Sequence, residues 1–169
     1  MISLSLSKSL HFRVSLLGAM MAAVLAGACV RSATAQPATP VFVHATSAPV
    51  TVAPGATATV VLKINIDKDY HLQGNNAKDP YVPTTVTLTA PTGVTIGKIV
   101  YPPSIRKQFS GETLPIYEGA ATIKITMTVG AKVKPGTINI PVAINYQGCN
   151  NTSCYPPTKM TAAVTITVK

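Results

Sequence analysis

Polar and apolar residues alternate along much of the second half of this chain. Across residues 121–129 every odd-numbered position is apolar and every even-numbered position is polar, and residues 163–168 show a similar alternation. Successive side chains of a β-strand point to opposite faces of the sheet, so this pattern predicts strands with one face on a core and one in water. No segment of the chain shows a helical period.

Short β-branched runs punctuated by Pro and Gly predict about seven strands. The turn signals Pro54-Gly55, Pro91-Thr92-Gly93 and Pro135-Gly136 separate several of them. Strands at this spacing, without crossover helices, favour an all-β fold in which two antiparallel sheets form a sandwich. The predicted strands are residues 41–46, 57–66, 84–90, 94–100, 120–129, 137–146 and 160–168.

Two polar stretches, residues 67–83 and 101–117, interrupt this series and are predicted to be long loops. Long loops on a rigid sandwich are a common location for functional residues.

Residues 1–35 have the three parts of a secretory signal peptide. Basic residues at the start precede an apolar run, and Ala33-Thr34-Ala35 forms a cleavage site before Gln36. We expect one domain over residues 36–169, exported to the periplasm. An uncleaved membrane anchor is one alternative. Lipidation of Cys29, which follows small residues as in bacterial lipoprotein signals, is another.

The charge of the predicted mature chain argues against a nucleic-acid partner. Three of the 14 Lys and Arg residues lie in the leader. The mature chain then has 11 Lys and Arg residues and 5 Asp and Glu residues, which gives a net charge of +6. These charges are scattered, aromatic residues are few and Trp is absent, whereas a nucleic-acid surface needs a basic stripe with aromatic platforms. The surplus is better explained by solubility or attraction to anionic surfaces.

Cys149 and Cys154 are the two cysteines of the predicted mature chain. Four small polar residues separate them, enough for a turn that brings their Cα atoms within the roughly 4.4 to 6.8 Å of a disulfide. Closing so short a loop stabilises the fold by only about 2 kcal/mol. The pair therefore fits either a weak structural staple or an accessible, exchange-active disulfide. A metal site is less favoured, because the candidate ligands His44 and His71 are distant in sequence.

The segment Tyr146-Gln147-Gly148-Cys149, followed by Cys154-Tyr155-Pro156-Pro157, resembles the active-site segment of the N-terminal periplasmic domain of the DsbD thiol:disulfide interchange family. Residues 67–72 resemble that family's early tyrosine-bearing segment, and residues 108–117 resemble its cap loop. The resemblance covers most of residues 41–168 and implies an immunoglobulin-like sandwich.

The resemblance also implies roles for individual residues. Cys149 and Cys154 would cycle between dithiol and disulfide, with Cys154 forming the mixed disulfide. In the cap loop of Phe109, Ser110 and Gly111, the phenylalanine would shield the pair, the alternative being that Phe109 belongs to the core. Further residues that could tune the pair are Tyr70, His71, Tyr146 and Tyr155.

The implied partners are a thioredoxin-like domain or protein, a membrane electron-transfer protein of the DsbD type, and oxidised periplasmic proteins. No cofactor is expected, and the domain is predicted to be a monomer. The sequence includes no transmembrane or thioredoxin-like domain of that family, so we expect another chain to supply the electrons.

Two departures from the family pattern affect the site. Four residues separate the cysteines, where well-known members have five, and this changes the turn. Lys107 and Gln108 stand where the family has acidic residues before the cap phenylalanine, so a carboxylate that tunes the pair is not predicted.

Two other functions fit the sequence less well. One is a secreted binding or assembly module that uses the sandwich edges and residues 101–117, with a purely structural disulfide. The other is a metal chaperone, disfavoured because Met127 and Met160 are isolated.

Overall fold

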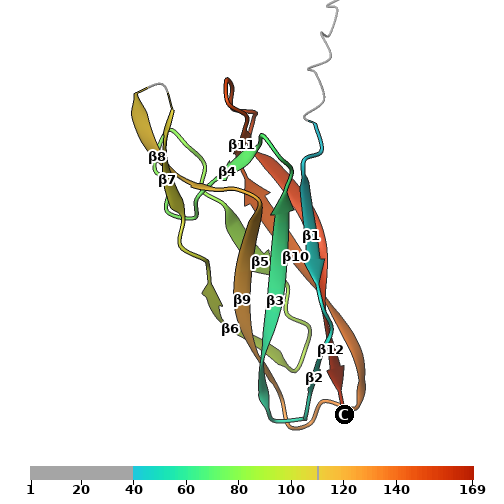
Figure 1. Ribbon diagram of the computed structural model, residues 1–169. Helices are drawn as coiled ribbons and strands as arrows, with labels where there is room; N and C mark the ends of the chain where they lie inside the picture. Colours follow the sequence, from blue (N-terminus) through green and yellow to red (C-terminus); the bar gives the residue numbers. More distant parts are fainter. Residues whose placement is uncertain (1–39, 110) are drawn as a thin grey trace, which may run out of the picture. The chain divides into compact units, whose positions relative to one another are not determined.

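The alternating segments form the long strands of a β-sandwich in the computed structural model. The structure describes residues 40–109 and 111–169. Within them the chain forms twelve β-strands and no helix (Figure 1). The seven predicted strands are present as β1 (Val43–Ser47), β3 (Thr57–Ile66), β5 (Thr85–Leu88), β6 (Val94–Val100), β9 (Ala120–Val129), β10 (Gly136–Tyr146) and β12 (Thr158–Val168).

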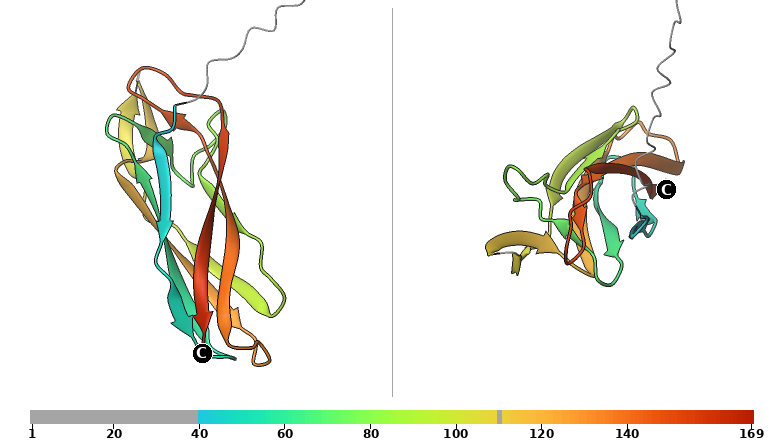
Figure 2. Two further views of the ribbon diagram at one scale, coloured as in Figure 1. Left: turned by 90° about the vertical axis from the view of Figure 1, so that its right-hand side faces the viewer. Right: turned by 90° about the horizontal axis from the view of Figure 1, so that it is seen from above.

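Two four-stranded sheets make up the sandwich. One has the order β1-β3-β9-β6 and the other the order β2-β12-β10-β5, where β2 is Val50–Val52. The long strands of both sheets run along the same axis (Figure 2). All the pairings are antiparallel except that of β2, which runs parallel to β12. The all-β sandwich prediction is therefore confirmed, and the parallel edge strand is an addition to it.

The core lies between these sheets and consists of the apolar positions of the alternating pattern. Each fully buried aliphatic side chain stabilises the fold by about 1.5 to 3 kcal/mol relative to an exposed one. The core side chains with no measurable exposure include Val60, Leu62, Ile64, Ile123, Ile125, Met127, Ile140, Ile144, Val164 and Ile166.

A third sheet, of order β11-β4-β8-β7, lies at the end of the sandwich away from the C-terminus (Figure 1). Its strands are β11 (Gly148–Cys149), β4 (His71–Gln73), β8 (Glu112–Tyr117) and β7 (Ile105–Phe109). The prediction that residues 101–117 form a loop was wrong, because β7 and β8 pair as a hairpin. Residues 67–83 likewise contain β4.

These strands lack the signals that predict strands. β7 is exposed at four of its five positions, and β8 contains Pro115, which is unusual inside a strand. All three residues of β4 are buried, so alternation cannot reveal it. This third sheet supplies Cys149 and most of its surroundings.

The predicted signal peptide, its junction at Gln36, and Cys29 lie outside the described residues. Within residues 40–109 and 111–169 the structure has no helix that is long and apolar enough to cross a membrane.

Candidate functional site

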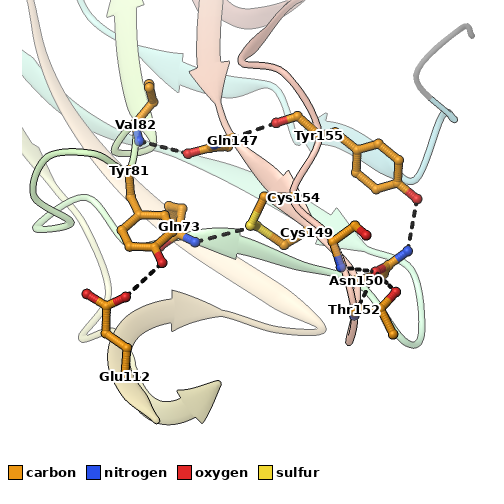
Figure 3. The surroundings of a disulfide bond; sticks show 11 residues. Gln73, Tyr81, Val82, Glu112, Gln147, Cys149, Asn150, Thr152, Cys154 and Tyr155 are labelled. Carbon is orange, nitrogen blue, oxygen red and sulfur yellow. Dashed lines mark hydrogen bonds between the residues drawn. A yellow bond between two sulfur atoms is a disulfide. The ribbon is translucent and has the colours of Figure 1, made fainter. Parts of the chain in front are cut away.

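Cys149 and Cys154 are joined by a disulfide with an S–S distance of 2.03 Å (Figure 3). They face each other across an isolated antiparallel bridge. The backbone N–H of Tyr155 donates to the carbonyl of Gly148, and the N–H of Asn150 donates to that of Ser153, both at 2.9 Å. The cysteines are thus a non-hydrogen-bonded pair, the closer of the two antiparallel arrangements. This explains a Cα–Cα distance of 4.0 Å, slightly below the predicted range.

The side chain of Asn150 organises the turn between the cysteines. Its Oδ1 accepts hydrogen bonds from the backbone N–H groups of Thr152 and Ser153 and from the Thr152 hydroxyl, at 2.8 to 3.0 Å. Its Nδ2 donates to the Tyr155 hydroxyl at 3.1 Å. An Asn side chain bonded to its own turn fixes the local backbone. The turn is therefore exposed but ordered.

The two cysteines differ sharply in accessibility. Cys149, on β11, is only 1% exposed. Cys154 is exposed to solvent. An incoming thiolate has to reach a sulfur along the disulfide axis, so access decides which sulfur is attacked. Sγ of Cys154 is therefore the more accessible sulfur of the disulfide.

Strand β4 places two side chains beside Cys149. His71 is the register partner of Cys149, and Gln73 lies two residues further along the same strand, so both point to the face that carries the Cys149 side chain. Nε2 of Gln73 donates to Sγ of Cys149 at 3.5 Å (Figure 3). Gln73 is fully buried, and its Oε1 has no hydrogen-bond partner among the residues that the structure describes. Gln73 was not singled out from the sequence, because β4 was not predicted.

The β7–β8 hairpin brings Phe109 to the same place. The Phe109 ring stacks on the His71 imidazole, with centroids 4.4 Å apart and planes 21° from parallel. Phe109 is half-buried and does not belong to the core. Together with His71, Glu112 and both cysteines it lines a pocket of about 220 Å³.

Two polar contacts involve side chains of this hairpin. The Tyr81 hydroxyl donates to Oε2 of Glu112 at 2.8 Å (Figure 3), and Nζ of Lys107 lies 2.6 Å from Oε1 of Glu118. Gly111, in the turn of the hairpin, has a φ of +88°, a left-handed conformation that favours glycine. Ser110 lies outside the described residues.

Glu112 supplies a carboxylate that the sequence did not predict. It is the register partner of Phe109 across the hairpin and lines the pocket with both cysteines. The residues directly before Phe109, Lys107 and Gln108, are not acidic, but the opposite strand brings a carboxylate to the pocket. The hydrogen bond with Glu112 raises the pKa of Tyr81.

The surroundings of His71 favour its neutral form. Burial lowers the pKa of His71, and the positive charge of Lys107 lowers it further, against an opposing effect of Glu118. A neutral imidazole is a good stacking surface for an aromatic ring, and a buried charged one is costly.

The other predicted tuning residues contact Phe42 rather than the pocket. Tyr70 stacks on the Phe42 ring with centroids 4.3 Å apart, Tyr155 lies 5.6 Å away, and Tyr146 packs edge-on at 6.3 Å. Gly148 completes this cluster, because a Cβ there would clash with the Phe42 ring. The four rings thus pack beside the cysteine hairpin at Gly148, and a tuning role for the tyrosines stays a prediction.

The residues considered as metal ligands lie in separate places. His44 pairs with Asp67 at 3.6 Å, whereas His71 lies in the cysteine pocket. In the described part of the chain no three His, Cys, Asp or Glu side chains are grouped to hold a metal ion.

Two solved structures of N-terminal periplasmic domains are similar to this chain. The N-terminal periplasmic domain of ScsB from Proteus mirabilis matches 72% of this chain with 12% identity and a TM-score of 0.50. The match covers 44% of that chain, so the present chain spans less than half its length. The reduced N-terminal domain of Neisseria meningitidis DsbD matches 75% of this chain and 89% of its own, with 15% identity and a TM-score of 0.46. A comparison with curated proteins gave no match.

The family comparison covers most of the chain. Residues 39–166 match the family described as the N-terminal region of the thiol:disulfide interchange protein DsbD. The matched range contains all the strands of the third sheet and both cysteines. With its β-sandwich and its Cys149–Cys154 disulfide, this chain belongs to the DsbD N-terminal domain family.

Proposed function

We propose that this chain is a periplasmic thiol-disulfide exchange module whose Cys149 and Cys154 cycle between disulfide and dithiol. The observation that carries the proposal is the asymmetry of the bond: Cys154 is exposed, whereas Cys149 is buried beside Gln73. One sulfur is open to an incoming thiolate, and the other is held as a leaving group. Membership of the DsbD N-terminal family supports the same chemistry.

The exchange has two steps. A partner thiolate attacks Sγ of Cys154, the S–S bond breaks, and its electron pair passes to Sγ of Cys149, which leaves as a thiolate and takes a proton. A second partner thiolate then attacks the partner sulfur of the mixed disulfide and releases Cys154. The partner dithiol becomes a disulfide, and this chain becomes a dithiol. In the reverse direction Cys154 attacks the disulfide of an acceptor protein and Cys149 resolves the intermediate.

The disulfide contributes little as a structural staple. It joins residues five apart in sequence that already face each other through backbone hydrogen bonds, so its loss removes only about 2 kcal/mol. Cys149 is buried, but neither cysteine belongs to the contiguous apolar cluster that fills the described part of the sandwich. A bond of this kind is better suited to exchange than to holding the fold.

Phe109 acts in this proposal as a shield. Its ring forms one wall of the pocket that contains the disulfide and rests on His71. A dithiol in an oxidising compartment needs protection from the wrong oxidants, and a docked partner would displace the hairpin. The proposed electron donor is a thioredoxin-like domain or protein supplied by a membrane protein of the DsbD type. The proposed acceptors are oxidised periplasmic proteins.

Single-cysteine variants test the proposal directly. Cys149→Ser and Cys154→Ser are each loaded with thionitrobenzoate and mixed with a thioredoxin that retains only its attacking cysteine. We expect the exposed Cys154 adduct to exchange at least about tenfold faster than the Cys149 adduct, because access limits attack. Wild-type disulfide should also be reduced by complete thioredoxin.

The opposite results would favour a binding module with a structural disulfide. These are a wild-type disulfide that thioredoxin leaves oxidised, or a reduction potential far below about −300 mV, where structural disulfides lie. Binding of a partner protein that is unchanged in the Cys149→Ser, Cys154→Ser double variant would point the same way.

A further inference from the structure

We propose that Gln73 is a positioning residue that stabilises the reduced state of Cys149 and so sets the balance between disulfide and dithiol. This inference rests on the proposed exchange function and names the group that tunes it. The amide of Gln73 is the hydrogen-bond donor that the structure places on Sγ of Cys149.

The backbone around Gln73 fixes the side chain in the site. Its N–H donates to the carbonyl of Gln147 at 3.0 Å, and its carbonyl accepts from the hydroxyl and the N–H of Thr84, at 2.6 and 3.3 Å. The residue has no solvent exposure. The amide is therefore confined beside the sulfur, and water does not replace the sulfur as its hydrogen-bond acceptor.

Reduction places an electron pair on a buried sulfur. When the disulfide opens, Cys149 leaves as a thiolate in a position that is 1% exposed, and an unpaired buried anion is costly. Nε2 of Gln73, 3.5 Å from this sulfur in the disulfide, is placed to donate to the thiolate. Hydrogen bonds to charged acceptors are stronger than those to neutral ones, so this contact strengthens on reduction.

The unpartnered Oε1 of Gln73 points to the same conclusion. A buried acceptor without a partner destabilises the state in which it occurs, here the disulfide. After the thiolate takes up a proton, Cys149 carries an S–H donor that the disulfide lacks, and Oε1 can accept it when the amide turns, at the expense of the Nε2 contact. The dithiol thus offers the amide both an acceptor and a donor, whereas the disulfide offers an acceptor alone.

Other groups at the pocket do not supply this stabilisation. Among the described lining residues, burial lowers the pKa of His71 in the disulfide form and so disfavours its cation, and the carboxylate of Glu112 opposes a nearby anion. The Tyr81 hydroxyl is already bonded to Glu112. No Lys or Arg is among these lining residues. Of the described side chains, Gln73 is the one whose N–H group donates a hydrogen bond to Sγ of Cys149.

The test compares Gln73→Leu and Gln73→Met with the wild-type chain in glutathione redox buffers. Both variants keep side-chain bulk and remove the amide. We expect the equilibrium to shift roughly tenfold toward the disulfide, a fall of about 30 mV in potential, and the apparent pKa of the Cys149 thiol to rise. Thr165→Val is the control, since it removes a side-chain hydrogen bond to Asn139 between β12 and β10 and touches neither Gln73 nor the cysteines. It should move the equilibrium less than about threefold.

A measurement on the wild-type chain covers the case in which the variants do not fold. The ¹⁵N resonance of the Gln73 side-chain amide should shift between the oxidised and reduced forms and should follow the titration of Cys149. An amide resonance that changes neither with the redox state nor with the titration of Cys149 would overturn the proposed role of Gln73. Folded variants with an unchanged reduction potential and an unchanged thiol pKa would also overturn it.

The glutathione equilibrium needs no protein partner, so the two proposals fail separately. If thioredoxin does not reduce the wild-type disulfide but Gln73→Leu shifts the glutathione equilibrium, the proposed function is wrong and the role of Gln73 stands. If thioredoxin exchange proceeds and the variants leave the equilibrium unchanged, the exchange function stands alone.

Discussion

The Phe109 ring lies almost parallel to the imidazole of His71, with the two centroids 4.4 Å apart. His71 belongs to β4 and is the register partner of Cys149, whereas Phe109 ends β7. The contact therefore ties the tip of the hairpin to the strand beside the disulfide. Its consequences for access, pH and packing can each be measured.

Replacing Phe109 with Ala should expose the disulfide. The side chain forms a wall of the pocket that holds Cys149 and Cys154, and its loss opens a path for small thiols. We expect reduction by dithiothreitol to be at least roughly threefold faster in Phe109→Ala. Ile105→Ala is a suitable control, since Ile105 is an exposed apolar residue on the same strand. Equal rates in all three proteins would show that Phe109 does not shield the bond.

The stability of the fold should depend on pH through His71. Burial lowers the pKa of His71 in the folded state, whereas the unfolded chain titrates near about 6.5. Below that pH the unfolded state binds the proton first, so stability is fully present above about 6.5 and falls as the pH decreases toward the folded pKa.

Thermal unfolding of the wild type and of His71→Asn between neutral pH and about pH 5 checks this expectation. The variant should lose less stability on acidification than the wild type. His44→Asn provides the matched control, because His44 is half-exposed and lies outside the pocket. The expectation fails if both variants show the same dependence.

Gly148→Ala should destabilise the site and the end of the sandwich next to it. A Cβ at this position would overlap the Phe42 ring, which is 1% exposed and contacts three tyrosines. Overpacking of this kind costs about 1 to 3 kcal/mol, measurable by urea unfolding. Gly97→Ala is the comparison, since a Cβ there comes no closer than 3.3 Å to its neighbours. A similar cost at both positions would contradict the packing argument.

The sequence predicted the sandwich because its long strands pack against one core. Alternation in β9 and β12 indicates that one face of each strand is buried and the other faces water. This pattern can be recognised without knowing which strands lie beside them. Alternation of polar and apolar residues does not predict β7, because that strand is exposed at nearly every position. It does not predict β4 either, because that strand is buried at every position. Both strands are defined by their hydrogen bonds to neighbouring strands rather than by a pattern of polar and apolar residues.

The site was predictable only where a motif marks it. Cys149 and Cys154 stand out through their spacing and flanking residues, and the disulfide between them is confirmed. Gln73 and Glu112 have no such signal, because their positions depend on the register of β4 with β11 and of β7 with β8. The predicted roles of Phe109 and His71 remain to be tested, although the structure brings both to the pocket.

The hydrogen bonds within the cysteine hairpin, residues 148–155, do not involve the sulfur atoms. The backbone contacts of Gly148 with Tyr155 and of Asn150 with Ser153 need no S–S bond, and neither do the side-chain bonds of Asn150. The hairpin should therefore present nearly the same contour to a partner before and after electron transfer. Recognition by shape alone would then bind both forms equally, so in the proposed exchange the sulfur chemistry has to distinguish a fresh partner from a spent one.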